Sequence, residues 1–127
     1  MLGIKIGFLV AAFLPWVAAI CAKAGAAGFD NNNPRPWMAG FTGWRARANA
    51  AQANAFEALP FFYGAVLIAL WSGADAWRVQ NLMVAWLVLR VVYLLMYLAG
   101  KGALRSLVWF LALAVNVWIL FLPVLIT

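Results

Sequence analysis

The stretch RARANAAQANAFEALP, residues 45–60, decides how this chain is organised. It leads directly into the apolar run 61–71, so that one segment carries arginines at its start and a carboxylate well inside it. On a helix, Arg47, Asn54 and Glu57 share one face, because separations of seven and three residues return to nearly the same angle. With Arg47 at a membrane surface, Glu57 lies about 15 Å deeper, near mid-bilayer. An ionisable group at that depth should face protein and have polar partners.

The composition excludes an ordinary soluble domain. Of the 127 residues, 69% are hydrophobic and only 9% are charged, which leaves room for one membrane domain, residues 1–127. The chain has no histidine, the commonest metal ligand and general base, so we expect no metal site. Its single cysteine, Cys21, is expected to be a small packed apolar residue. The net charge of +6 does not indicate nucleic-acid binding, because the basic residues lie at the ends of apolar spans.

The apolar spans predict an all-α integral membrane protein with a bundle of four transmembrane helices. A signal peptide is a poor explanation of the first span, since the remaining chain is equally membrane-like. Asp75 is the expected N-cap of the third helix. The predicted helices cover residues of about 2–22, 44–71, 76–99 and 103–122.

Residues 25–43 form the longest polar segment, and its asparagines, prolines and glycines predict a loop. One interpretation is a plain connector. The other is a lid over the mouth of the bundle, whose shape a pair between Asp30 and Arg35 would fix. Composition favours the connector.

Polar residues recur on one face of the third helix, where Arg90, Tyr93 and Tyr97 are spaced by three and four. Counted from the same membrane surface, Arg90 and Glu57 reach a similar depth, so the two charged groups are predicted to meet inside the bundle. Such a pair either contacts a ligand or fixes the helix register. The two tyrosines are either part of a site or core aromatics.

The fourth helix carries Arg105, Trp109, Ala112 and Asn116 along a single face. Arg105 is either a functional cation or a basic anchor at the membrane surface. Asn116 is expected to hold helices together through hydrogen bonds rather than to bind a ligand.

The distribution of charge predicts the orientation in the membrane. Four spans place both termini on one side, and the two loops on the other side collect most of the basic residues. By the positive-inside rule these loops, including 25–43, face the cytoplasm, and the termini face away from it. The basic residues of the cytoplasmic side are Lys23, Arg35, Arg45, Arg47, Lys101 and Arg105.

Four stretches together resemble the membrane-associated proteins in eicosanoid and glutathione metabolism, the MAPEG family. Residues 45–60 are similar to its second-helix signature, and RVVYLLMY, residues 90–97, to its third helix. LRS, residues 104–106, resembles the start of its fourth helix. The loop around residues 29–35 is similar to the short bacterial branch, which implies the cytoplasmic (inner) membrane of a bacterium.

The resemblance implies a homotrimer of four-helix subunits, with glutathione as co-substrate held between neighbouring subunits near the cytoplasmic face. Arg105 matches the arginine that stabilises the glutathione thiolate in catalytic members. The residues expected to bind glutathione are Arg47, Asn54, Glu57, Arg90, Tyr93 and Tyr97. The chain departs from the family's eicosanoid enzymes at Ala50, where they carry an arginine, so that Arg45, Arg47 or Lys101 would have to supply that cation.

Three functions remain open from the sequence. The first is a glutathione-dependent transferase or peroxidase that acts on lipophilic electrophiles or lipid hydroperoxides taken from membrane lipid. The second is a non-catalytic scaffold or accessory subunit of a larger membrane assembly. A small transporter is the weakest, because no broken-helix pair or internal repeat is present.

Overall fold

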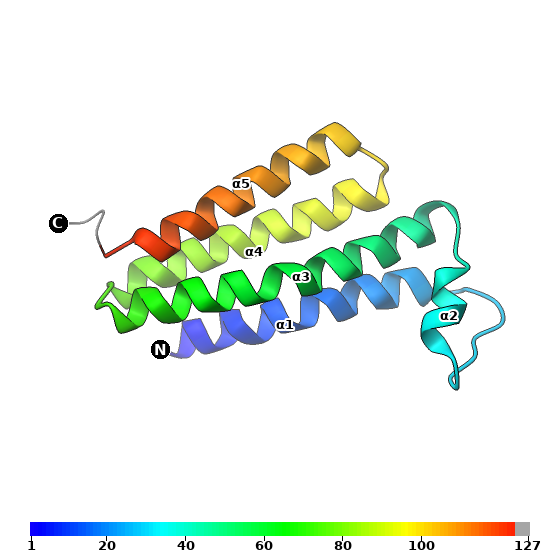
Figure 1. Ribbon diagram of the computed structural model, residues 1–127, viewed down its shortest axis with the longest axis horizontal. Coiled ribbons are helices and arrows are strands. Elements are labelled where there is room, and N and C mark those ends of the chain that lie inside the picture. Colours follow the sequence, from blue (N-terminus) through cyan, green and yellow to red (C-terminus); the bar gives the residue numbers. More distant parts are fainter. Residues whose placement is uncertain (124–127) are drawn as a thin grey trace.

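The protein is a bundle of four long helices that run side by side, with a fifth, short helix at one end (Figure 1). The computed structural model describes residues 1–123. Each long helix is long and apolar enough to cross a membrane, as the hydrophobic runs predict. The helices are α1 (Leu2–Lys23), α2 (Pro34–Ala39), α3 (Gly43–Trp71), α4 (Ala76–Leu98) and α5 (Gly102–Phe121).

Short turns join the last three helices and leave them antiparallel to their neighbours. Asp75 caps α4 as predicted, since its carboxylate accepts a hydrogen bond from the backbone N–H of Arg78 at 3.1 Å. Gly73 and Gly100 adopt φ of +90° and +71° in the two turns, a conformation that residues with a Cβ avoid. The start of α1 and the end of α5 therefore lie at one end of the bundle, and α2 lies at the other (Figure 1).

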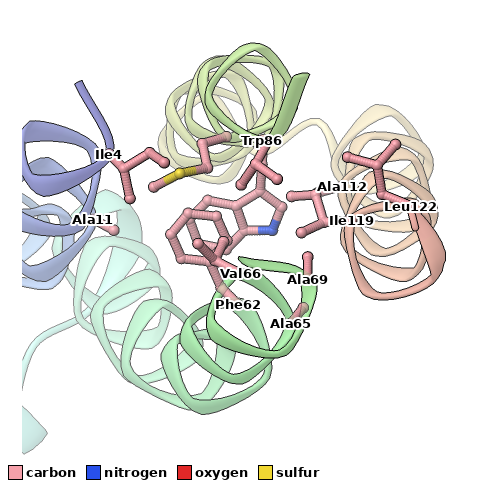
Figure 2. Packing of buried hydrophobic residues seen from close by; sticks show 12 residues of the cluster. Ile4, Ala11, Phe62, Ala65, Val66, Ala69, Trp86, Ala112, Ile119 and Leu122 are labelled. Carbon is pink, nitrogen blue, oxygen red and sulfur yellow. The ribbon is translucent and has the colours of Figure 1, made fainter. Parts of the chain in front are cut away.

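The core is apolar in the half of the bundle that holds the start of α1 and the end of α5. Phe62 on α3 stacks on Trp86 of α4, with ring centroids 3.8 Å apart and an interplanar angle of 8°. Side chains from α1 and α5, among them Ile4 and Ile119, close around this pair (Figure 2). All four long helices thus contribute to one packed cluster, which fixes their mutual arrangement.

Small residues let α1 approach α4 closely. A Cβ at Gly7 would lie only 2.7 Å from the terminal methyl carbon of Met83, and one at Gly3 would overlap the side chain of Gln80. These two glycines are one helical turn apart and form the small-residue contact typical of helix packing in lipid. The opposite surface of α1 exposes large apolar side chains such as Phe13 and Trp16, which suits contact with lipid tails.

The segment 25–43 differs from the predicted loop because it contains α2. Pro34 is the first residue of this helix, where the missing N–H of proline costs nothing. The pair of Asp30 with Arg35, which would have fixed the shape of a lid, is not formed among the described residues. The Asp30 carboxylate instead accepts hydrogen bonds from the backbone N–H of Asn32 at 3.0 Å and from the side chain of Asn33 at 3.4 Å, which are nearer along the chain.

Candidate functional site

Arg90 and Asn54 form the polar centre of the bundle. Arg90 on α4 is only 5% exposed, and its guanidinium donates a hydrogen bond of 2.6 Å to Oδ1 of Asn54 on α3. The guanidinium also lies over the rings of Tyr93, at 4.4 Å from the centroid, and of Trp86, at 5.9 Å. A buried arginine in a membrane needs such partners, and here an amide and two aromatic faces supply them.

Glu57 does not form the predicted ion pair with Arg90. Within residues 1–123 no ion pair involves Glu57, and its side chain is exposed. Glu57 is one turn beyond Asn54 on α3, and the shorter side chain of Asn54 already meets the guanidinium at this depth. The two charged residues do line the same cavity, so they share a site without direct contact.

This shared space, which we call the central cavity, has a volume of about 220 Å³ and lies between α3, α4 and α5. It carries Arg90 and Glu57 as charged groups, and most of the remaining wall is apolar. Asn116 also lines it, and its Oδ1 atom is buried without a hydrogen-bond partner among the described residues. The lining residues are Asn54, Glu57, Ala58, Phe61, Trp86, Arg90, Trp109, Ala112, Leu113 and Asn116.

A second space, the arginine cavity, has a volume of about 230 Å³ and lies towards the α2 end of the same helices. The guanidinium of half-buried Arg105 lies 4.4 Å from the centroid of the Tyr97 ring, and Tyr97 packs edge-on against Tyr93. Among residues 1–123 the Arg105 side chain makes no hydrogen bond or ion pair, so its donors are available to a ligand. The lining residues are Asn54, Tyr93, Tyr97, Arg105, Ser106, Trp109 and Phe110.

The two cavities are neighbours, because Asn54 and Trp109 line both of them. The spacing on the fourth helix predicts this arrangement, since Arg105, Trp109 and Asn116 were expected on one face. The structure thus brings together Asn54, Glu57, Arg90, Tyr93, Tyr97 and Arg105 of the predicted site. The apolar walls formed by Phe61, Trp86 and Leu113 were not predicted, because nothing in the sequence distinguishes them from lipid-facing residues.

Arg47 is the one predicted site residue that the structure places elsewhere. Its guanidinium donates hydrogen bonds to the backbone carbonyls of Tyr97 at 3.2 Å and Leu98 at 3.1 Å, at the end of α4. Arg45 does the same at the end of α1, with its Nη1 atom 2.8 Å from the carbonyl oxygen of Ala22 and 2.7 Å from that of Ala24. Both arginines therefore donate to backbone carbonyls at helix C-termini that have no partner within the helix. A positive charge at this end also interacts favourably with the helix dipole.

A third hollow, the α2 cavity, has a volume of about 400 Å³ and lies between α2 and α3. Its polar lining residues are Arg35, Asn49 and Gln52. Among residues 1–123 no group of three or more histidine, cysteine, aspartate or glutamate side chains could hold a metal ion.

Comparison with known proteins gives one match. None of the curated proteins and none of the solved structures compared with the chain matches it. The model of the MAPEG family matches residues 4–125 of the 127. This match covers α1 from residue 4 onwards, the whole of α3, α4 and α5, and every residue of both cavities, and the chain therefore belongs to the MAPEG family.

Proposed function

We propose that this protein is a glutathione-dependent transferase or peroxidase that acts on lipophilic electrophiles or lipid hydroperoxides. The observation that carries the proposal is the position of Arg105 in the arginine cavity, where its guanidinium lies against the ring of Tyr97 and has no hydrogen-bond partner among the described residues. Membership of a family associated with glutathione supports the same conclusion.

The chemistry follows from the charge of the guanidinium. A free thiol has a pKa of about 8.5, so only a few per cent of it is ionised at neutral pH. A permanently protonated arginine beside the sulfur stabilises the thiolate, which is the nucleophile. In the transferase reaction the thiolate forms a bond to the electrophilic carbon of the second substrate, and the leaving group departs with the electron pair of the bond that breaks. In the peroxidase reaction the thiolate attacks the terminal hydroperoxide oxygen and the O–O bond breaks, which gives a sulfenic acid and an alkoxide that takes a proton to become the alcohol. A second glutathione then converts the sulfenic acid into glutathione disulfide and water.

Glutathione would occupy the arginine cavity, with its sulfur towards Arg105 and its polar groups towards Asn54, Tyr93 and Tyr97. The cavity opens on the surface of one subunit, so a neighbouring subunit would complete it. We place α3 at the subunit contact, where exposed Ala50 and Ala53 permit close approach. The assembly would be a homotrimer, which native mass spectrometry in mild detergent tests directly; a protein that is only monomeric contradicts it.

The orientation belongs to the same proposal. The basic residues gather at the α2 end of the bundle, so we place this end in the cytoplasm and the termini on the opposite side of the inner membrane. Glutathione would then enter from the cytoplasm, and the apolar substrate would enter from the lipid.

The decisive experiment measures two properties of the purified protein. Equilibrium dialysis should show that glutathione binds, and ultraviolet absorbance should rise as the bound thiol ionises. S-methylglutathione is the control, because it has no ionisable thiol and should bind without the rise in absorbance. If glutathione neither binds nor produces the absorbance, the enzyme proposal is wrong.

A second candidate is a non-catalytic accessory subunit, and one observation favours it. Ala50 lacks the cation of the eicosanoid enzymes, and the two arginines nearest to it, Arg45 and Arg47, are engaged with backbone carbonyls. Of the three cations that could replace the missing one, only exposed Lys101 remains uncommitted within the described residues. Failure of glutathione to bind, with the oligomer intact, would support this candidate.

A further inference from the structure

The α2 cavity takes no part in the proposed chemistry at Arg105, although it is larger than the central cavity and the arginine cavity. Its volume of about 400 Å³ is within the range that is usual for the sites of small ligands, about 300–1,000 Å³. It lies between α2 and the first half of α3, at the end of the bundle where the basic residues gather (Figure 1). Its lining residues are Arg35, Met38, Asn49, Gln52, Ala53 and Phe56, none of which is proposed to bind glutathione.

The wall that α2 contributes to this cavity is held in place by packing. Met38 is 6% exposed and belongs to the same buried cluster as Ala22 of α1 and Ala48 of α3. The indole N–H of Trp37 donates a hydrogen bond of 3.1 Å to the backbone carbonyl of Ala27. The cavity is therefore formed before a ligand binds, which lowers the entropic cost of binding.

The charge of the cavity favours an anion. Arg35 is the one charged residue among the described residues that line it, and this side chain is exposed. Asp30, the nearest acidic residue in the sequence, uses its carboxylate for hydrogen bonds within its own turn. Half-buried Asn49 and Gln52 add amide N–H donors to the forked donors of Arg35. Guanidinium and amide donors together suit the oxygens of a phosphate.

The lining of the cavity changes from polar to apolar along α3. Its residues on this helix, at positions 49, 52, 53 and 56, share one face because they are three, four and seven residues apart. From Asn49 to Phe56 the helix advances about 10 Å away from its start and into the membrane. The polar Asn49 and Gln52 come first, and the apolar Ala53 and Phe56 follow. A phospholipid at the membrane surface has the same order of head group and acyl chain, whereas a soluble phosphate would fill only the polar part.

We propose that the α2 cavity binds an anionic phospholipid of the adjacent leaflet. The phosphate accepts hydrogen bonds from Arg35, Asn49 and Gln52, and the start of an acyl chain lies against Ala53 and Phe56. A zwitterionic phospholipid fits less well, because its cationic group finds no carboxylate among the described lining residues. Ala53 is also part of the surface that we place at the subunit contact, so the lipid would lie beside that contact.

The test compares three probes in the absence of glutathione. Purified full-length protein in neutral detergent is titrated with dioctanoyl phosphatidylglycerol, with dioctanoyl phosphatidylcholine or with glycerol 1-phosphate, and native mass spectrometry counts the molecules bound to each subunit. The anionic lipid should bind saturably, with one molecule per subunit, and at least about fivefold more tightly than phosphatidylcholine. Glycerol 1-phosphate has no acyl chain and should bind at least about tenfold more weakly than the anionic lipid. Equal binding of the two lipids, or of the head group alone, would overturn the proposal.

Arg35→Gln should lower the affinity for phosphatidylglycerol by about fivefold and leave that for phosphatidylcholine unchanged. Because Arg35 is exposed, this substitution should not disturb the fold. Lys101→Gln is the matched control, since it removes an exposed positive charge at the same end of the bundle but outside the cavity. Equal losses in the two variants would indicate a general attraction between anionic lipid and a basic surface, and would contradict a specific site.

Phe56→Ala tests the apolar part of the cavity. It should weaken the binding of both lipids by about two- to fivefold and leave the preference for the anionic lipid unchanged. Phe13→Ala is its control, because Phe13 on α1 is exposed to nearly the same extent, 45% against 44%, and lies outside the cavity. If Phe56→Ala binds both lipids as tightly as the wild type does, the acyl chain does not lie in the cavity and the proposal is wrong.

Glutathione is the alternative occupant, because its carboxylates could also accept hydrogen bonds from Arg35. Under the proposal, glutathione does not displace phosphatidylglycerol, and Arg35→Gln binds glutathione as the wild type does. Displacement of the lipid would assign the cavity to the glutathione site and overturn the proposal. If the wild type binds no glutathione, the enzyme proposal fails while the three lipid titrations still decide this one, so the two failures are distinguishable.

Discussion

The two halves of the bundle use the same three helices for different purposes. Towards the chain termini, α3, α4 and α5 meet through Phe62, Trp86 and Ile119, which are fully or almost fully buried. Towards α2, the same helices meet through Arg90, Asn54 and a pair of cavities. One half is packed and the other half keeps room for ligands, and Trp86 lies at the boundary, because it stacks on Phe62 and also lines the central cavity.

The difference shows where each half draws its stability. In lipid, helices associate through van der Waals packing and hydrogen bonds, because the surrounding tails are as apolar as the side chains. The packed half supplies the first of these forces, and the half with the cavities depends on a few polar contacts. Substitutions in the packed half should therefore change mainly the stability of the fold. Substitutions in the half with the cavities should change mainly the chemistry of the ligand.

The largest effect is expected for Arg105→Ala in the half with the cavities. The guanidinium is complementary to the thiolate and much less so to the neutral thiol, so turnover should fall by on the order of a hundredfold while glutathione binding changes little. Arg105→Lys should retain part of the thiolate absorbance, because the charge survives and the forked geometry does not. Parallel losses of binding and turnover in Arg105→Ala would show that Arg105 only binds.

Phe62→Ala should produce the opposite pattern in the packed half. Loss of the ring that stacks on Trp86 should lower the free energy of unfolding by about 2 kcal/mol, since a cavity remains where contacts were lost. Unfolding by sodium dodecyl sulfate in mixed micelles measures this loss. Glutathione binding to the folded fraction should not change; a large change would mean that the two halves are coupled.

Asn54→Ala tests the polar contact that holds the half with the cavities together. The variant leaves buried Arg90 without its hydrogen-bond acceptor and should cost about 1.5 kcal/mol of unfolding free energy. Asn54→Asp, which restores an acceptor and adds a counter-charge, should recover at least this amount at neutral pH. If both variants are equally destabilised, the hydrogen bond to Arg90 is not the cause.

Arg47→Ala should have a smaller effect, about 1 kcal/mol on the same unfolding measurement. It removes two hydrogen bonds from the end of α4, but water at the membrane surface can replace them. Lys101→Ala is the control, because Lys101 is an exposed cation at the same end of the bundle. The interpretation as a helix cap fails if the two variants lose the same stability.

The smallest effect is expected for Glu57→Gln. A buried ion pair with Arg90 would make this substitution strongly destabilising, but the structure gives Arg90 another partner and leaves Glu57 exposed. We therefore expect the unfolding free energy to change by less than about 0.5 kcal/mol. A loss above about 3 kcal/mol would restore the ion pair as a stabilising contact.

Hydropathy and turn residues were enough to predict the four long helices, because a span of apolar residues with polar ends has few alternatives in a membrane. The short helix α2 was not predicted, since six residues carry too little periodic signal and its prolines suggested a loop. Proline at the first position of a helix favours the helix instead, and only the structure showed that Pro34 occupies this position.

The sequence placed the site residues at the right depth but not always with the right partner. The rise per residue brings Asn54 and Glu57 to within about one helical turn of the depth of Arg90, and it cannot say which of the two α3 side chains faces the guanidinium. That choice depends on the rotation and tilt of the helices, which are set by packing elsewhere, for example at Phe62. The role of Arg47 as a cap of α4 could not be predicted either. Its carbonyl partners lie 50 and 51 residues further along the chain, and only the packing of the helices brings them together.

The two arginines at the start of α3 also imply an order of assembly. Arg45 reaches carbonyls 21 and 23 residues earlier in the chain, so this contact can form as soon as the second long helix has left the ribosome. Arg47 must wait until the end of α4 has been synthesised. We therefore expect pairing of α1 with α3 to precede docking of α4 and α5, and the cavities to form only after α5 has docked. Cross-linking of nascent chains of increasing length would reveal this sequence of events.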